Sequence, residues 1–132
     1  MTRHYIEHVN VEQRTDAWHL LRAGRVNGST AKAVLAKVSK GEAAARRDLR
    51  VQLALERVLE TSLDDSTFVN GDMQRGIDLE AEARAAYEIA TGRVVREVGF
   101  ISSTRQGVGY SPDGVIGDYE GLVEIKVPRS AT

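Results

Sequence analysis

The apolar residues of this chain change their spacing at Gly92, and this change sets the fold class. Before Gly92 they recur at helical spacing, as at Leu49, Leu53 and Val58; after it, short valine- and isoleucine-rich runs alternate with turn residues. A repeat of about 3.6 residues indicates helices and a repeat of two indicates strands. We therefore expect an α+β fold, with N-terminal helices packed on a small mixed or antiparallel sheet.

Capping and turn residues bound the expected elements. Thr15 or Asp16 can cap a first helix, which Gly24 closes. At 132 residues the chain has the length of a single domain, residues 1–132. Further helices are expected at 31–38, 42–59 and 72–90, and strands at 94–101, 108–111, 115–116 and 122–127.

Composition excludes several classes of protein. The chain has no cysteine, so it has neither disulfides nor thiolate metal sites, as suits a reducing compartment. Its start contains no apolar run long enough for a signal peptide, and no stretch approaches the roughly 20 apolar residues of a membrane span. We expect a cytoplasmic protein with no membrane partner.

Charge is unevenly distributed along the chain. Residues 22–50 contain eight basic and two acidic residues, whereas residues 51–132 contain eight basic and fourteen acidic residues. One part could attract a polyanion while another gathers carboxylates, as a metal-dependent nuclease requires. The alternative is a solvated, charged helix face.

A carboxylate and a lysine interrupt the last apolar strand. Side chains alternate along a strand, so Glu124 and Lys126 share one face and the apolar residues around them share the other. Asp113 lies eleven residues before Glu124, across a turn at 118–121, and a hairpin would bring the two carboxylates together.

Neighbouring carboxylates repel each other unless a cation lies between them, and their oxygen atoms suit Mg²⁺ or Mn²⁺. Lys126 could orient the attacking water or help to deprotonate it. These are the components of phosphodiester hydrolysis. The alternatives are an exposed Glu-x-Lys ion pair and an ordinary turn at Asp113.

Glu80 is a third candidate carboxylate. In the helix at 72–90, Met73 and Ile77 mark an expected buried stripe, and Glu80 lies beside it between small residues, so it could face the sheet. The alternative is an ion pair between Glu80 and Arg84 on a solvated helix.

Four motifs, WHLLRAGRVNGST, MQRGIDLEAEARAAYE, GYSPDG and LVEIKVP, occur in this order between about residues 13 and 128. Together they resemble the phage lambda exonuclease family of viral recombinases, in the PD-(D/E)xK nuclease superfamily. The resemblance implies a restriction-endonuclease-like core. Since members of that family continue beyond the Glu-x-Lys strand, it also implies that the C-terminal part of the family fold is missing here.

The resemblance implies a role for each candidate. Asp113, Glu124 and the backbone carbonyl of Ile125 would bind Mg²⁺, or Mn²⁺, and Glu80 would support the metal site. Lys126 would position the attacking water. All four side chains would then belong to the catalytic site.

The same resemblance implies that Arg22 and Ser29 bind the 5′-phosphate of a DNA end. Ser29 precedes the helix expected at 31–38, where free N–H groups favour an anion. Its alternative role is that of an ordinary N-cap.

The implied activity is magnesium-dependent, 5′ to 3′ exonucleolytic hydrolysis of linear duplex DNA in phage-type recombination, within an infected or prophage-bearing bacterial cell. The implied partners are duplex DNA ends, further copies of the chain in a trimer, and a single-strand annealing protein. An endonuclease on the same scaffold, and a non-catalytic DNA-binding or assembly module, are the alternative functions.

Other residues invite weaker hypotheses. His4 and His8 could bind a metal from one helical face, but a flexible N-terminus is the favoured interpretation. We expect Trp18 to anchor the core rather than stack on bases, and His19 either to pack beside it or to lie on the helix surface.

Overall fold

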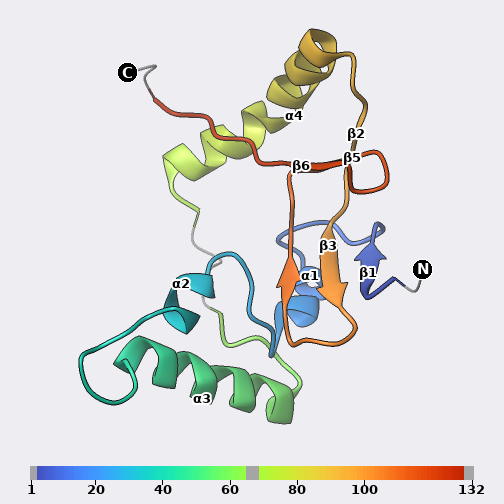
Figure 1. Cartoon of the computed structure of the whole chain (residues 1–132). Coiled ribbons are helices and arrows are strands. Elements are labelled where there is room, and N and C mark those ends of the chain that lie inside the picture. The colour runs from blue at the N-terminus through green and yellow to red at the C-terminus, as the bar shows by residue number, and fades with distance from the viewer. Residues whose placement is uncertain (1–2, 65–68, 130–132) are drawn as a thin grey trace. The chain divides into compact units, whose positions relative to one another are not determined.

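The computed structural model describes residues 3–64 and 69–129. They form two compact units, which Figure 1 shows within the whole chain. Of the described residues, the first unit contains 3–64 and 99–111, and the second contains 69–98 and 112–129. Folding of residues 1–132 as a single domain stays a prediction. No helix in the described ranges is long and apolar enough to cross a membrane.

The first unit combines three helices with a three-stranded antiparallel sheet. The sheet order is β1-β3-β4, with Tyr5 opposite Ser103 and Ile101 opposite Tyr110. Val26 and Val108 form a separate parallel bridge. The elements are β1 (Tyr5–His8), α1 (Asp16–Arg22), α2 (Ala31–Val34), α3 (Ala44–Leu59), β3 (Phe100–Ser103) and β4 (Gly109–Tyr110).

Aromatic packing forms much of the core of this unit. Phe100 is fully buried and Trp18 is 8% exposed. A side chain at Gly109 would lie 2.2 Å from the Phe100 ring, so only glycine fits there. The indole Nε1 of Trp18 donates to Ser111 Oγ at 2.7 Å. Trp18 therefore anchors the core, as the sequence predicted.

The second unit contains one long helix and a second antiparallel sheet. The sheet order is β2-β5-β6, and β5 and β6 form a hairpin in which Gly114 lies opposite Val123. The side chain of Asn70 caps the helix by accepting from Met73 N at 2.9 Å, and Gly92 ends it in the left-handed conformation. The elements are α4 (Gly71–Thr91), β2 (Val95–Arg96), β5 (Gly114–Ile116) and β6 (Gly121–Val123).

Two predicted elements have different bounds from those expected. The strand predicted at 94–101 is divided into β2 and β3, because its two halves pair in different sheets. The helix predicted at 31–38 ends at Val34. Leu35 and Val38 are exposed, so no apolar packing supports a longer helix.

The N-terminal segment also differs from the prediction. Tyr5–His8 is a strand paired with β3 rather than a flexible end. His8 Nε2 lies 3.0 Å from Ser102 Oγ, so His4 and His8 do not share a helical face. His19 packs against Trp18, with the ring centroids 4.9 Å apart, as expected.

Candidate active site

The β5–β6 hairpin brings Asp113 beside the segment that contains Glu124. The paired residues of the hairpin end with Gly114 opposite Val123, directly before Glu124. The backbone N–H of Asp113 donates to the Val123 carbonyl at 3.1 Å. The hairpin expected from the sequence spacing is therefore confirmed.

The carboxylate of Asp113 is held by the backbone of the opposite segment. Its Oδ2 accepts from Ile125 N at 2.7 Å. In a longer strand, the N–H of Ile125 would donate to a backbone carbonyl. Because the Asp113 side chain accepts it instead, β6 ends at Val123. The strand predicted at 122–127 was therefore too long. Among the described residues, no hydrogen bond to Oδ1 of Asp113 is present, so this oxygen can accept a ligand.

Glu124 and Lys126 lie on the same side of this segment, as alternation predicted, and Lys126 Nζ donates to Glu124 Oε1. This hydrogen bond is the main cause that raises the pKa of Lys126; desolvation opposes it, and the charges of Glu124 and Asp113 reinforce it. An ordinary lysine has a pKa of about 10.4, so Lys126 is a cation at neutral pH. This state favours charge stabilisation or water orientation over proton abstraction.

Glu80 forms the alternative ion pair that the sequence left open. Arg84 Nη2 lies 2.7 Å from Glu80 Oε1, and the two side chains are 12% and 24% exposed, so the pair is not on a solvated surface. The same guanidinium donates to the backbone carbonyl of Asp113, which connects the pair to the hairpin.

The buried stripe predicted for α4 was wrong. Met73 is 49% exposed, and no residue of α4 is buried. Polar contacts attach this helix to the C-terminal segment instead. For example, Arg75 Nη1 donates to the carbonyls of Val127 and Pro128 at 3.2 and 3.1 Å.

The donors around Asp113 have the chemistry of a hard-cation site. Oδ1 of Asp113, the carboxylate of Glu124 and the nearby carbonyl of Ile125 are oxygen ligands of the kind that Mg²⁺ and Mn²⁺ prefer. In the described ranges, no three His, Cys, Asp or Glu side chains are close enough to hold one metal ion together. Participation of Glu80 in metal binding stays a prediction.

The structure brings Arg22 and Ser29 together in the first unit. Arg22 stacks on the Trp18 ring at 4.1 Å, and its Nη2 donates to Ser29 Oγ at 3.3 Å and to Asp64 Oδ2 at 3.2 Å. Their binding of a 5′-phosphate stays a prediction. Sequence reasoning missed Asp64, because nothing in the sequence relates it to a residue 42 positions earlier.

Ser29 lies in a turn organised by Asn27. Asn27 Oδ1 accepts from Ser29 N at 3.0 Å and from Ser29 Oγ at 2.5 Å. Thr30, not Ser29, occupies the N-cap position. Because α2 has only four residues, the helix-terminus argument for anion binding does not hold, and the ordinary N-cap role was wrong. The Asn-Gly pair was the available signal for this turn.

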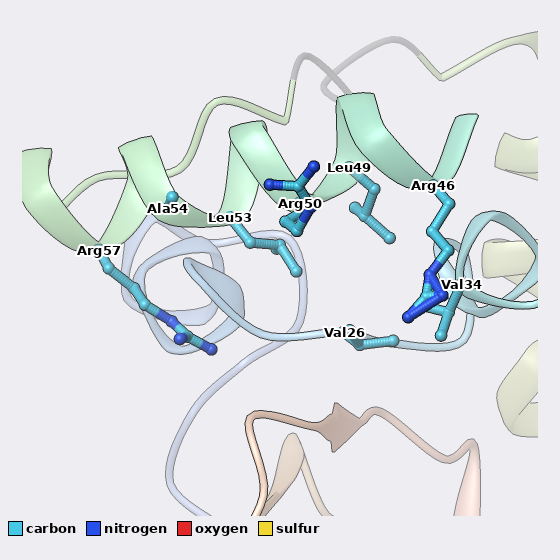
Figure 2. A pocket seen from close by; sticks show the side chains of 8 residues that line it. All are labelled: Val26, Val34, Arg46, Leu49, Arg50, Leu53, Ala54 and Arg57. Carbon is cyan, nitrogen blue, oxygen red and sulfur yellow. The ribbon is translucent and has the colours of Figure 1, made fainter. Parts of the chain in front are cut away.

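Three arginines surround an apolar pocket on α3 (Figure 2). The pocket has a volume of about 350 Å³. Glu42 pairs with Arg50 at 3.0 Å and with Arg46 at 4.0 Å. The hydrogen bond between Glu42 and Arg50 lowers the pKa of Glu42 and raises that of Arg50. Part of the positive charge of residues 22–50 is thus paired internally. The pocket is lined by Val26, Val34, Arg46, Leu49, Arg50, Leu53, Ala54 and Arg57.

Comparison with known proteins identifies the family. The profile of the YqaJ-like viral recombinase domain matches residues 17–132. No curated protein sequence matches the chain. The crystal structure of an alkaline exonuclease (LHK-Exo) from Laribacter hongkongensis is similar, with 40% identity and a TM-score of 0.65 over 88% of this chain and 55% of that chain. The structure of LHK-Exo in complex with dAMP has 41% identity and a TM-score of 0.67, over 87% and 54% of the two chains.

The chain thus spans about half the length of these exonucleases. Its helices and antiparallel sheets, together with these structural matches, confirm the α+β fold prediction. The chain belongs to the YqaJ-like viral recombinase domain family, the lambda-exonuclease-like family that its four motifs resemble.

Proposed function

We propose that the chain carries the catalytic site of a metal-dependent exonuclease that degrades linear duplex DNA from 5′ to 3′ in phage-type recombination or DNA end processing. The observation that carries this proposal is the hydrogen bond from Ile125 N to the Asp113 carboxylate, which holds Asp113 beside the segment where Glu124 pairs with Lys126. The resemblance to LHK-Exo, an alkaline exonuclease crystallised with dAMP, supports the same reaction class.

Asp113, Glu124 and the Ile125 carbonyl would hold the divalent cation. When bound, Mg²⁺ supplies a Lewis acid that stabilises negative charge on the phosphoryl oxygens. Asp113 requires little reorganisation to bind it, because its backbone N–H and Oδ2 are already hydrogen-bonded within the hairpin. Pre-positioned ligands reduce the cost of assembling a charged site.

Lys126 would act as a cation. Its raised pKa keeps it protonated at neutral pH, and its side chain is 78% exposed, so it can reach a phosphate or a water molecule. A fixed positive charge beside a phosphodiester offsets the negative charge that develops during hydrolysis. Lys126 would therefore orient the attacking water and stabilise the transition state.

Arg22 and Ser29 would bind the 5′-phosphate of the DNA end. A guanidinium donates two parallel hydrogen bonds to a phosphate, and stacking on Trp18 holds its plane. The carboxylate of Asp64 now accepts from Arg22, so a phosphate would have to share or replace this contact. Assembly as a trimer, an annealing partner and a cytoplasmic location belong to the same proposal.

The first test is digestion of linear duplex DNA with 5′-phosphate or 5′-hydroxyl ends, in Mg²⁺ or EDTA. Labels at either end of one strand give the direction. We expect magnesium-dependent loss of the 5′ label first, abolished in Asp113→Ala and retained in Asp118→Ala, a control in the turn of the same hairpin.

Each other outcome supports a different function. Cleavage of covalently closed circular DNA would favour an endonuclease. DNA binding with magnesium-dependent thermal stabilisation, but without digestion, would favour the non-catalytic module. Digestion that persists in Asp113→Ala would refute the proposed site.

A further inference from the structure

Arg84 on α4 makes four polar contacts within the second unit. Its Nε and Nη2 donate to the backbone carbonyl of Asp113 at 3.3 and 3.1 Å. Nη2 also donates to Glu80 Oε1 at 2.7 Å, and Nη1 lies 2.9 Å from Glu97 Oε1. The Arg84 side chain is 12% exposed. Low exposure strengthens these charged hydrogen bonds relative to those of a surface arginine.

These contacts complete the immobilisation of Asp113. Its backbone N–H is bound to Val123, its Oδ2 to the Ile125 N–H, and its carbonyl to Arg84. A residue held at three points has little freedom to turn its remaining oxygen away from the position of a cation. Arg84 provides the only one of these three bonds that comes from a side chain outside the hairpin, among the residues that the structure describes.

Arg84 also acts on the carboxylate of Glu80. The guanidinium, 2.7 Å from Glu80 Oε1, offsets the negative charge of that carboxylate. The planar guanidinium can reach the Glu80 carboxylate and the Asp113 carbonyl at once, because its donors diverge in a fixed plane. A lysine in this position could reach one of them but would lack that fork.

We propose that Arg84 is the positioning residue of the candidate active site, holding Asp113 through its backbone carbonyl and Glu80 through its carboxylate in the geometry that binds the divalent cation. This inference rests on the proposed function, since it assigns Arg84 a role in the same site. Arg84 itself need not touch the metal or the DNA. Its contribution acts through the two acidic residues.

The test compares four variants with the wild-type chain. Arg84→Ala removes all the contacts and Arg84→Lys keeps the charge. Glu97→Gln alters only the contact with the exposed partner, whose side chain is 74% exposed. Arg93→Ala is the matched control, an arginine of the same unit whose pairing with Glu120 is exposed and 3.9 Å long. Titration calorimetry with Mg²⁺ alone gives the metal affinity, and rates of DNA digestion give the Mg²⁺ requirement and KM.

We expect Arg84→Ala to raise the dissociation constant for Mg²⁺, and the Mg²⁺ concentration for half-maximal rate, by about 10- to 100-fold, as for partners that orient metal ligands. The KM for DNA at saturating Mg²⁺ should stay unchanged. Arg84→Lys should recover part of the affinity. Glu97→Gln and Arg93→Ala should match the wild type.

Wild-type Mg²⁺ dependence in folded Arg84→Ala would overturn the inference. An equal loss in Glu97→Gln would also overturn it, by showing that any broken ion pair of Arg84 has the same effect. If Arg84→Ala does not fold, the comparison of Arg84→Lys with Arg93→Ala decides, and equal Mg²⁺ affinities refute the role.

Failure of the wild type to bind Mg²⁺ would refute the metal site and this inference together. If the wild type binds Mg²⁺ but does not digest DNA, only the proposed activity is refuted. The calorimetric comparison of the variants still tests the role of Arg84.

Discussion

Glu56 is a buried carboxylate whose loss should measurably destabilise the first unit. It lies on α3 and is 3% exposed. Its Oε2 accepts from Gly24 N at 2.7 Å, and its Oε1 accepts from Leu63 N at 2.9 Å and from Gln52 Nε2 at 3.2 Å. Glu56 therefore connects α3 to two other parts of the chain. One is the turn that follows α1, and the other is the segment that leads to Asp64.

Replacing Glu56 with glutamine removes one of the two acceptor oxygens and leaves the size of the side chain nearly unchanged. The amide oxygen of the glutamine can still accept from the buried N–H of Gly24. Its NH₂ group then faces the part-buried N–H of Leu63, so that two donors face each other. An unpaired buried donor costs about 1–3 kcal/mol. Water can reach Leu63 in part, and removing the charge also removes the cost of burying it. We therefore expect a loss of about 1–2 kcal/mol, in the lower half of that range.

Glu56→Ala removes both acceptors and leaves a void, so it should cost about 3–5 kcal/mol. Urea unfolding, followed by the fluorescence of the buried Trp18, measures both variants against Glu60→Gln, an exposed glutamate that follows the same helix. A Glu56→Ala protein with the unfolding midpoint and slope of the wild type would refute the reasoning. It would mean that water or neighbouring groups satisfy both N–H groups at no cost.

Three further predictions concern the candidate site. Lys126→Ala should lower the rate of DNA digestion by about 100-fold or more. Its DNA affinity, measured by fluorescence anisotropy, should stay near that of the wild type. A near-normal rate of digestion would remove Lys126 from the mechanism. Arg22→Ala should reduce the preference for 5′-phosphorylated over 5′-hydroxyl ends by about tenfold, as expected for the loss of a charged hydrogen bond. The control Arg105→Ala should keep the wild-type preference. An unchanged preference in Arg22→Ala would place the anion site elsewhere. Glu124→Gln should lower the pKa of Lys126 toward its ordinary value in an NMR titration of the metal-free protein. Because that pKa is raised in the folded protein, the stabilising contribution of the pair is complete below the ordinary value of about 10.4 and is lost as the pH rises through the higher, folded value.

Local signals in the sequence predicted the elements that they bound directly. Thr15 does cap α1, and Gly92 does end α4 in the left-handed conformation. The spacing between Asp113 and Glu124 predicted a hairpin, because a turn of fixed length leaves few possible registers. These features depend on residues close in the chain, so the sequence contains the information they require.

The structure altered what depended on packing partners. α2 is shorter than predicted because Leu35 and Val38 find no apolar surface, and β6 is shorter because the Asp113 side chain accepts the N–H of Ile125. The contact between Arg22 and Asp64 had no signal in the sequence. Each of these outcomes depends on which side chain reaches a given backbone group.

By itself, the sequence determined the family, the four helices and the hairpin that precedes Glu124. Only the tertiary structure decided that Arg84 joins Glu80 to the carbonyl of Asp113, and that Arg22 donates to Asp64. The physical reason is the range of the interactions. Capping, turn formation and strand alternation act over a few residues, whereas the fork of an arginine bonds whichever acceptors the folded chain brings within about 3 Å.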